Sequence, residues 1–192
     1  MNTGSDKISK VIVAITGASG AVYGLELIKQ LVALECIKDI AVIYSENGSK
    51  VWDFEKVMDI PVSKKITVFE NNDMFACPAS GSAGYQAMFA APCSMGTLAS
   101  IAAGTAGTLI LRAADVMLKE RKPLILLSRE APLSLIHIKN MERVTQAGAI
   151  VFPASPFFYH HPKNLHEAIS ALVSRLISIT GISTPQIEWG KE

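Results

Sequence analysis

The sequence of 192 residues predicts a doubly wound α/β fold, in which helices cover both faces of a mostly parallel sheet. Three observations predict this class. Short apolar runs rich in β-branched residues alternate with longer segments whose apolar residues recur at helical spacing. Glycine and hydroxyl residues stand where strands pass into helices, above all at 16–20. A chain of this length with 49% hydrophobic residues also suits one domain with a sizeable core.

The first half of the chain contains four of the expected strands. Residues 11–15 are an unbroken apolar run, and 21–34 form a helix with Leu25, Ile28, Leu31 and Val32 on one face. A second strand at 40–44 precedes a helix at about 47–57, and a short strand follows at 66–69. Residues 87–91 form a strand that ends at Pro92, and a helix runs from Leu98 to near Gly104.

The second half continues the alternation. A helix at 108–120 stops before Pro123, and 124–127 form a buried strand. A helix at 135–147 precedes the last strand, at 149–152, and an amphipathic helix at 165–179 ends the fold. Residues 1–9 are expected to be a flexible N-terminus, and 181–192 a C-terminal tail.

Charge and cysteine usage narrow the function classes. A net charge of +1 excludes a strong electrostatic preference for nucleic acid or anionic membranes. The cysteines (Cys36, Cys77 and Cys93) share no short metal or redox spacing, which favours reduced thiols. Residues 1–10 are polar and carry no apolar export signal. These features predict a cytoplasmic protein.

Residues 74–111 contain no Asp, Glu, Lys, Arg or His. Pro78 and Pro92 interrupt this stretch, and its Gly, Ser and Ala content does not suit a membrane span. Burial inside the domain accounts for part of it. Obligate subunit interfaces are depleted in charge, so burial against other copies of the chain is the favoured explanation. The stretch therefore predicts a homo-oligomer.

Ligands of parallel α/β sheets bind beyond the carboxyl ends of the strands. The loops expected there are 16–20, Ser45, 92–97, 128–132 and 153–162. In the first loop Gly17 and Gly20 permit a tight turn, and Ser19 can cap the helix or bind a phosphate. A plain strand-to-helix connection explains this turn equally well when it is taken alone.

Two further loops carry candidate residues. Ser94, Gly96 and Thr97 form a second turn that opens a helix, which indicates either an anion or flavin cradle or a simple helix cap. Arg129 and Glu130 directly follow a buried strand, where they are expected to face the ligand crevice. A carboxylate that is partly desolvated beside an aromatic ligand has a raised pKa and can transfer protons near neutral pH.

Other charged and aromatic residues leave alternatives open. Arg112, Asp115 and Lys119 form one stripe of a helix, and a solvated, self-paired face is favoured for Asp115. The surplus positive charge of this stripe would suit a phosphate. Arg175 is expected to be a surface arginine when considered alone, and Tyr159 either packs or donates to a phosphate. The remaining candidates, His160 and His161, lack metal-ligand spacing, and no metal is expected.

Seven motifs in this order resemble the flavin prenyltransferases of the UbiX-like flavoprotein family. The resemblance covers nearly the whole chain, as one flavoprotein domain. The motifs are 15–21 (ITGASGA), 78–82 (PASGS), 92–98 (PCSMGTL), 112–116 (RAADV), 118–121 (LKER), 129–132 (REAP) and 158–159 (FY).

The resemblance implies a Rossmann-like fold that binds FMN and attaches a dimethylallyl group to N5 and C6 of the reduced flavin. It implies dimethylallyl monophosphate, or sometimes the diphosphate, as donor, and no metal. Prenylated FMN would then serve a UbiD-like decarboxylase, in ubiquinone synthesis or aromatic acid decarboxylation. Family members assemble as dodecamers.

The resemblance also implies roles for individual residues, some of which would come from neighbouring subunits. Glu130 would be the acid–base residue, with Glu55 a second carboxylate near the reacting carbons and Ser19 beside them. Lys119, Tyr159 and Arg175 would hold the prenyl phosphate, with Arg112 nearby. The flavin contacts would be Gly17, Ala18, Ser19, Ser45, Ser94, Met95, Gly96, Thr97 and Arg129.

The sequence departs from the family at Gly107-Thr108, where relatives carry an Asn- or Asp-rich pair, at Leu111 and at Gly96. One rival is an FMN-dependent decarboxylase of the cysteine type. That branch has an early active-site His, whereas no His precedes His137 here. A second rival is a non-catalytic flavin-binding subunit of a decarboxylase complex.

Overall fold

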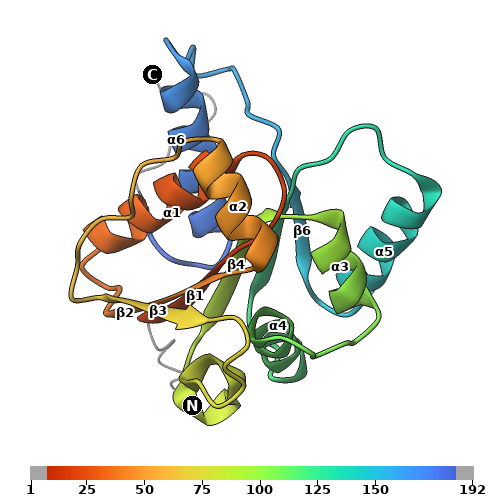
Figure 1. Cartoon of the computed structure of the whole chain (residues 1–192). Helices are drawn as coiled ribbons and strands as arrows, with labels where there is room; N and C mark the ends of the chain where they lie inside the picture. Colours follow the sequence, from red (N-terminus) through yellow and green to blue (C-terminus); the bar gives the residue numbers. More distant parts are fainter. Residues whose placement is uncertain (1–7, 185–192) are drawn as a thin grey trace, which may run out of the picture.

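A computed structural model describes residues 8–184; the expectations for residues 1–7 and 185–192 lie outside the described residues. Six strands form one sheet in the order β3-β2-β1-β4-β5-β6, and every neighbouring pair is parallel (Figure 1). The doubly wound α/β fold is thus confirmed. The strands are β1 (Lys10–Ile15), β2 (Asp39–Tyr44), β3 (Ile66–Glu70), β4 (Ala87–Cys93), β5 (Leu124–Ser128) and β6 (Ile150–Pro153).

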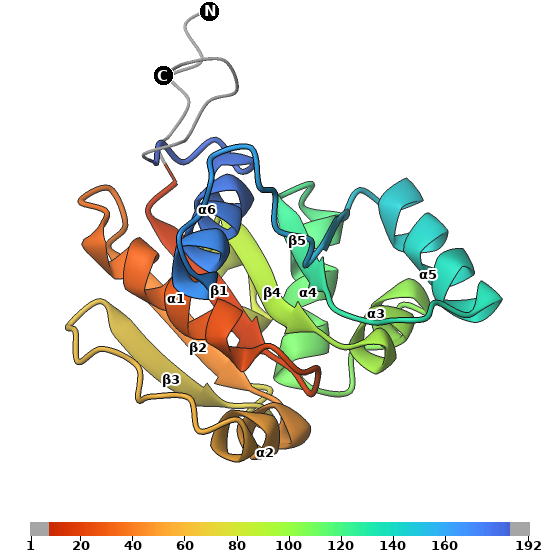
Figure 2. The same ribbon diagram turned by 90° about the horizontal axis from the view of Figure 1, so that it is seen from above.

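Helices cover both faces of this sheet (Figure 2). Side chains of β1 alternate between two cores: Val11, Val13 and Ile15 pack with α1 and α6, whereas Ile12 and Ala14 pack with α3 and α4. The α-helices are α1 (Ala21–Ala33), α2 (Glu46–Phe54), α3 (Met95–Ala102), α4 (Leu109–Lys119), α5 (Leu135–Gln146) and α6 (Leu165–Ser178).

Four local features differ from the expectations. Helix α3 begins three residues early, because the Ser94 side chain accepts the Thr97 N–H and caps it there. Helix α2 ends at Phe54, and Lys56 has a φ of 53°, so Glu55 follows the helix instead of lying within it. Two short 3₁₀ helices, η1 (Cys77–Ala79) and η2 (Gly81–Ala83), were not expected. Ser9, expected in a flexible terminus, accepts hydrogen bonds from Lys38 and Asp39.

The strand order reverses between β1 and β4. From β1 the chain moves outward to β2 and β3, and from β4 it moves outward the other way to β5 and β6. The loops that leave the carboxyl ends of β1 and β4 therefore diverge onto opposite faces of the sheet and leave a crevice between them. This geometry places loops 16–20 and 92–97 on the two sides of one candidate binding region.

The charge-free stretch 74–111 is only partly buried by its own chain. Every residue of β4 is buried, but Met74 is 39% exposed and Phe75 is fully exposed. Helix α5 also presents Leu135 and Ile136 to solvent. Folding of one chain therefore leaves large apolar side chains uncovered. No helix among residues 8–184 has both the length and the apolar character needed to cross a bilayer.

The first turn of α2 packs directly on the end of β1. A Cβ added at Gly48 would meet the carbonyl oxygen of Ile15, which is backbone and cannot rotate away. Gly48→Ala should therefore lower the free energy of unfolding by about 1–3 kcal/mol, although alanine is the better helix former. Urea unfolding measures the change.

Gly96→Ala is the matched control, since Gly96 also lies in a helix and its added Cβ would meet only Ser94 Oγ, at 4.0 Å. That variant should gain up to about 1 kcal/mol from helix propensity. Equal shifts of the same sign in both variants would contradict the close packing of α2 on β1.

Candidate functional site

Helices α1, α2 and α3 are among those that begin at the carboxyl edge of the sheet, where first-turn N–H groups and partial positive charge favour an anion (Figure 2). Helix α1 follows β1, α2 follows β2 and α3 follows β4. Ser45 caps α2 by accepting the Gly48 N–H at 3.0 Å. Ser94 caps α3, and its hydroxyl also lies 3.0 Å from that of Thr97. The structure thus brings three of the expected flavin-contact loops to one edge.

Helix α1 already has an anion at its N-terminus. The Glu55 carboxylate accepts the N–H groups of Gly20, at 3.0 Å, and of Ala21, at 2.9 Å. We expected this turn to offer its N–H groups to a phosphate; instead, two of them bind a carboxylate supplied from 35 residues along the chain. An external phosphate therefore meets less uncompensated positive charge at α1 than at α3, whose first turn has no acidic residue. The first turn of α2 carries Glu46, which pairs with Lys50.

The environment of Glu55 keeps its carboxylate charged. Partial burial raises the pKa, but hydrogen bonds from the Ser19 hydroxyl and from the Gly20 and Ala21 N–H groups outweigh it, together with the charge of Arg129. The net effect is a lowered pKa. Arg129 itself donates from Nε to the Ser19 carbonyl oxygen at 3.1 Å. Ser19, Glu55 and Arg129 thus form one cluster, drawn from three separate loops.

Glu130 lies beside this cluster in sequence but is exposed. Its Oε1 accepts only the N–H of the next residue, Ala131, at 3.2 Å. The desolvation expected for this carboxylate is not supplied by its own chain. A bound ligand or a neighbouring copy would have to supply it.

Lys119 and Arg175 lie away from the carboxyl edge. Helix α4 starts there, since the Leu109 N–H donates to the carbonyl of Asn71 just after β3, and its 11 residues carry Lys119 about 16 Å away. Arg175 lies ten residues into α6, beside Ser174, which donates to Gln30 in the second half of α1. One chain therefore does not bring these two cations to Glu55 and Arg129.

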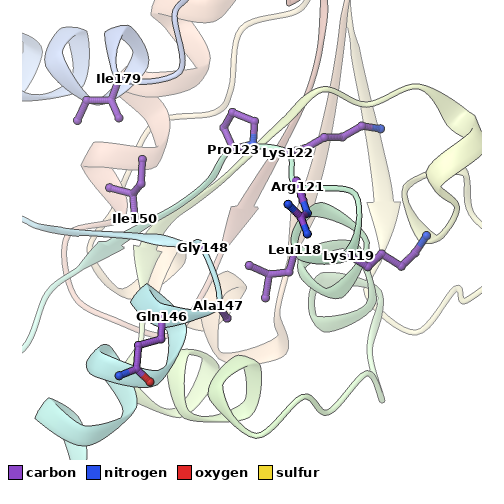
Figure 3. A pocket seen from close by; sticks show the side chains of 10 residues that line it. All are labelled: Leu118, Lys119, Arg121, Lys122, Pro123, Gln146, Ala147, Gly148, Ile150 and Ile179. Atoms are coloured by element: carbon purple, nitrogen blue, oxygen red, sulfur yellow. The ribbon is translucent and has the colours of Figure 1, made fainter.

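Lys119 lines a different cavity, of about 780 Å³, at the opposite edge of the sheet (Figure 3). Ile150 and Ile179 form the far side of this cavity, and the Lys119 side chain points away from them. Its ammonium group lies 3.1 Å from the Glu120 carboxylate, which also pairs with Lys122. This carboxylate offsets part of the local positive charge.

The two remaining candidates for substrate binding, Arg112 and Tyr159, contact neighbouring residues of their own chain. Arg112 donates to the carbonyl of Ala79 at 3.0 Å and pairs with Asp115 at 2.7 Å, so the self-paired face expected for Asp115 is confirmed. Tyr159 lies in the β6–α6 loop, where its ring stacks on Phe157 at 4.8 Å.

A second cavity, of about 560 Å³, opens at the carboxyl edge between β2, β3 and the start of α4. Ser45 lines it together with Tyr44, Glu70, Gly107 and Thr108. The departure from the family at Gly107-Thr108 therefore falls beside a candidate flavin contact. Sequence reasoning missed Tyr44, although its place as the last residue of a strand was a usable signal.

No group of three residues suited to hold a metal ion is present in the part of the chain that the structure describes. The carboxyl edge carries the carboxylates of Glu55 and Glu130 as well as donor groups. Its hydroxyls, its N–H groups and the Arg129 guanidinium suit a phosphate-bearing organic ligand.

Comparisons with known proteins show the family of the chain. A family model described as Flavoprotein matches residues 1–179. The flavin prenyltransferase UbiX of Pseudomonas aeruginosa is 38% identical over 200 residues, covering 95% of each chain. A crystal structure of AnUbiX in complex with FMN and dimethylallyl pyrophosphate is 37% identical, with a TM-score of 0.82 over 95% of this chain and 100% of that chain. A dodecameric FMN-dependent UbiX-like decarboxylase from Escherichia coli O157:H7 is 34% identical, with a TM-score of 0.86 and the same coverage.

Glu55→Gln should lower the free energy of unfolding at pH 7 by about 0.5–1 kcal/mol, because the α1 N-terminus loses its charged partner. The native pKa of Glu55 lies below the unfolded value of about 4.3, so its stabilisation is complete above that pH and is lost as the pH falls through the native pKa. Urea unfolding of both proteins from pH 7 to pH 3 should show the difference shrinking. Glu142→Gln on exposed α5 is the control, and a difference that stays constant with pH would contradict this assignment.

Cys93, the last residue of β4, should resist thiol reagents. It is fully buried, and burial raises the pKa of its thiol to about 12. Maleimide labelling at pH 8 followed by peptide mapping should find Cys93 unmodified in the folded protein and modified in urea. Rapid labelling of Cys93 in the folded state would show that the strand end is open to solvent.

Proposed function

The chain belongs to the flavoprotein family and is a flavin prenyltransferase, and we propose that it transfers a dimethylallyl group from dimethylallyl phosphate to N5 and C6 of reduced FMN. One observation carries the proposal. The chain matches flavin prenyltransferases along nearly its whole length, and it places the N-termini of α1 and α3 and the Ser19–Glu55–Arg129 cluster at its strand-order reversal, with the N-terminus of α2 one strand away.

The residues at the carboxyl edge fit FMN. We assign its phosphate and ribityl groups to Ser45 and to the α3 N-terminus at Ser94–Thr97, because Glu55 already offsets the charge of α1. Gly17, Ala18 and Arg129 then remain for the ring. When bound, reduced FMN supplies the two nucleophilic ring atoms, N5 and C6.

The prenyl donor needs a different set of groups. Loss of phosphate from an allylic carbon develops negative charge on the leaving group and a delocalised positive charge on the carbon chain. Lys119, Tyr159 and Arg175 are assigned to the leaving phosphate, with Arg112 nearby. Exclusion of water keeps the allylic carbon from hydrolysis. The proposal leaves the monophosphate and the diphosphate open as donors.

Two carboxylates are assigned to the chemistry, one to proton transfer and one to orientation and charge stabilisation. Attachment at C6 releases a proton from the ring carbon, and Glu130 is assigned as the group that exchanges it. Glu55 keeps its charge at the α1 N-terminus, where it can orient the Ser19 hydroxyl and stabilise nearby positive charge.

A complete site requires more than one copy of the chain. Lys119 and Arg175 lie about 15 Å from the carboxyl edge of their own chain, so we assign them to the sites of neighbouring copies. The exposed side chains of Phe75, Leu135 and Ile136 offer apolar area for such contacts. The E. coli relative is dodecameric, and we propose the same assembly here.

The product is assigned to a UbiD-like decarboxylase as recipient, in ubiquinone synthesis or aromatic acid decarboxylation. We keep the cytoplasm as the proposed location, supported by three cysteines that are all free thiols.

Incubation with reduced FMN and dimethylallyl phosphate under anaerobic conditions should yield flavin heavier by one prenyl unit in mass spectrometry. Glu130→Gln should still bind FMN and should slow turnover at least about 100-fold, the usual contribution of a general acid–base. Unchanged turnover in that variant would remove Glu130 from the mechanism. Release of CO2 from a cysteinyl substrate, without prenylated flavin, would establish the rival decarboxylase activity.

Mixed oligomers test whether the site is shared between copies. Lys119→Met and Glu130→Gln should each be nearly inactive alone. Co-assembled in equal amounts, they should recover activity in about a quarter of the sites, because a site then draws Lys119 and Glu130 from different chains. Mixed oligomers as inactive as the parents would place both residues in one chain's site. The double variant, mixed with itself, is the control.

A further inference from the structure

Thr16 joins the two loops at the strand-order reversal through its side chain. It is 1% exposed and directly follows β1. Its hydroxyl donates to the Pro92 carbonyl oxygen at 2.8 Å and accepts the Ser94 N–H at 2.8 Å. The Thr16 N–H donates to the same carbonyl at 3.2 Å. These contacts connect segments that are 76 to 78 residues apart.

The backbone makes only part of this connection, through the Thr16 N–H and the Pro92 carbonyl. The pairing of β1 with β4 extends to Ala14 and Ala90, and the pairing of β4 with β5 shifts register between Ala90 and Cys93. Pro92 lies within the shifted segment and has no N–H to donate. The Thr16 hydroxyl replaces the missing ladder contact, since it both donates to this segment and accepts from it.

The residues on the two sides of this link are those assigned to the flavin. Thr16 adjoins Gly17–Ser19, and Ser94 is the N-cap of α3. We propose that Thr16 is a positioning residue, whose hydroxyl sets the spacing between the two flavin-binding loops without touching the flavin. The inference rests on the proposed function. Thr16 lies within the motif 15–21, but neither the resemblance nor the cluster at Glu55 gives its side chain a role.

Three substitutions separate hydrogen bonding from side-chain shape. Thr16→Val keeps the shape and removes the hydroxyl, Thr16→Ser keeps the hydroxyl, and Thr16→Cys matches serine in shape with a much weaker donor and acceptor. Thr180→Val is the matched control. The Thr180 hydroxyl also donates to a backbone carbonyl, that of Ile177 in α6, at 2.7 Å.

The measurements are the FMN dissociation constant, from quenching of flavin fluorescence, and the KM for dimethylallyl phosphate. We expect Thr16→Ser to bind FMN within about twofold of the natural protein and Thr16→Val to bind about 10- to 100-fold more weakly, as for a misplaced binding loop. The KM for dimethylallyl phosphate should stay unchanged, because Lys119 and Arg175 belong to other elements. Thr180→Val should leave both constants unchanged.

Equal FMN affinity in the natural protein and Thr16→Val would overturn the inference, and so would an equal loss in Thr180→Val. If Thr16→Val does not fold, the serine and cysteine variants decide: weaker binding by cysteine alone supports the inference, and equal binding overturns it. Failure of the natural protein to bind FMN would instead overturn the proposed function, so the two failures are distinguishable.

Discussion

The site depends on one topological constraint, the reversal of strand order between β1 and β4. Because consecutive strands move outward in opposite directions from this pair, the loops after β1 and β4 separate and leave a crevice at the carboxyl edge. A crevice formed by separating loops must still have a defined width. The Thr16 hydroxyl, held between Pro92 and Ser94, provides the side-chain contact that spans it at its base. Helices α1 and α3 begin on either side of this contact, so the contact helps to set the distance between their N-termini.

The charged residues of the proposed site lie in two places, at the carboxyl edge of the sheet and far from it along α4 and α6. At the carboxyl edge Glu55 offsets the partial charge of the α1 N-terminus, which is why we assign the flavin phosphate to Ser45 and the α3 N-terminus. The cations assigned to the second phosphate, Lys119 and Arg175, lie far along helices that run antiparallel to the strands. In the proposed assignment, a single copy has the groups for one phosphate at the carboxyl edge and the groups for the other phosphate elsewhere. The proposed assembly would bring the two sets together and would cover apolar side chains such as Phe75, which is exposed in a single chain.

Much of the fold could be predicted from the sequence, because the local residue pattern indicates the type of element. The apolar run 11–15 indicates a strand, and the helical spacing of apolar residues in 165–178 indicates a helix. The loops of the site could be placed as well, since parallel strands must bring their carboxyl ends to one edge. What could not be predicted depends on contacts between distant residues. The carboxylate of Glu55 binds N–H groups 34 and 35 residues away, and no local pattern indicates that partner. The sequence predicts the start of α3 at Leu98 instead of Met95, because Ser94 suits both a helix cap and a ligand cradle. The distance of Lys119 from the carboxyl edge follows only once the direction of α4 is known.

The central claim is that flavin binds in the crevice between loops 16–20 and 92–97 and meets a prenyl phosphate held by other copies. A crystal structure of the assembled protein with FMN and dimethylallyl phosphate tests it most directly. The account predicts the flavin ring between Ser19 and Ser94, with the prenyl phosphate on Lys119 and Arg175 of neighbouring copies. A crevice closed by protein side chains, or a flavin bound in the cavity beside Ile150 and Ile179, would contradict it.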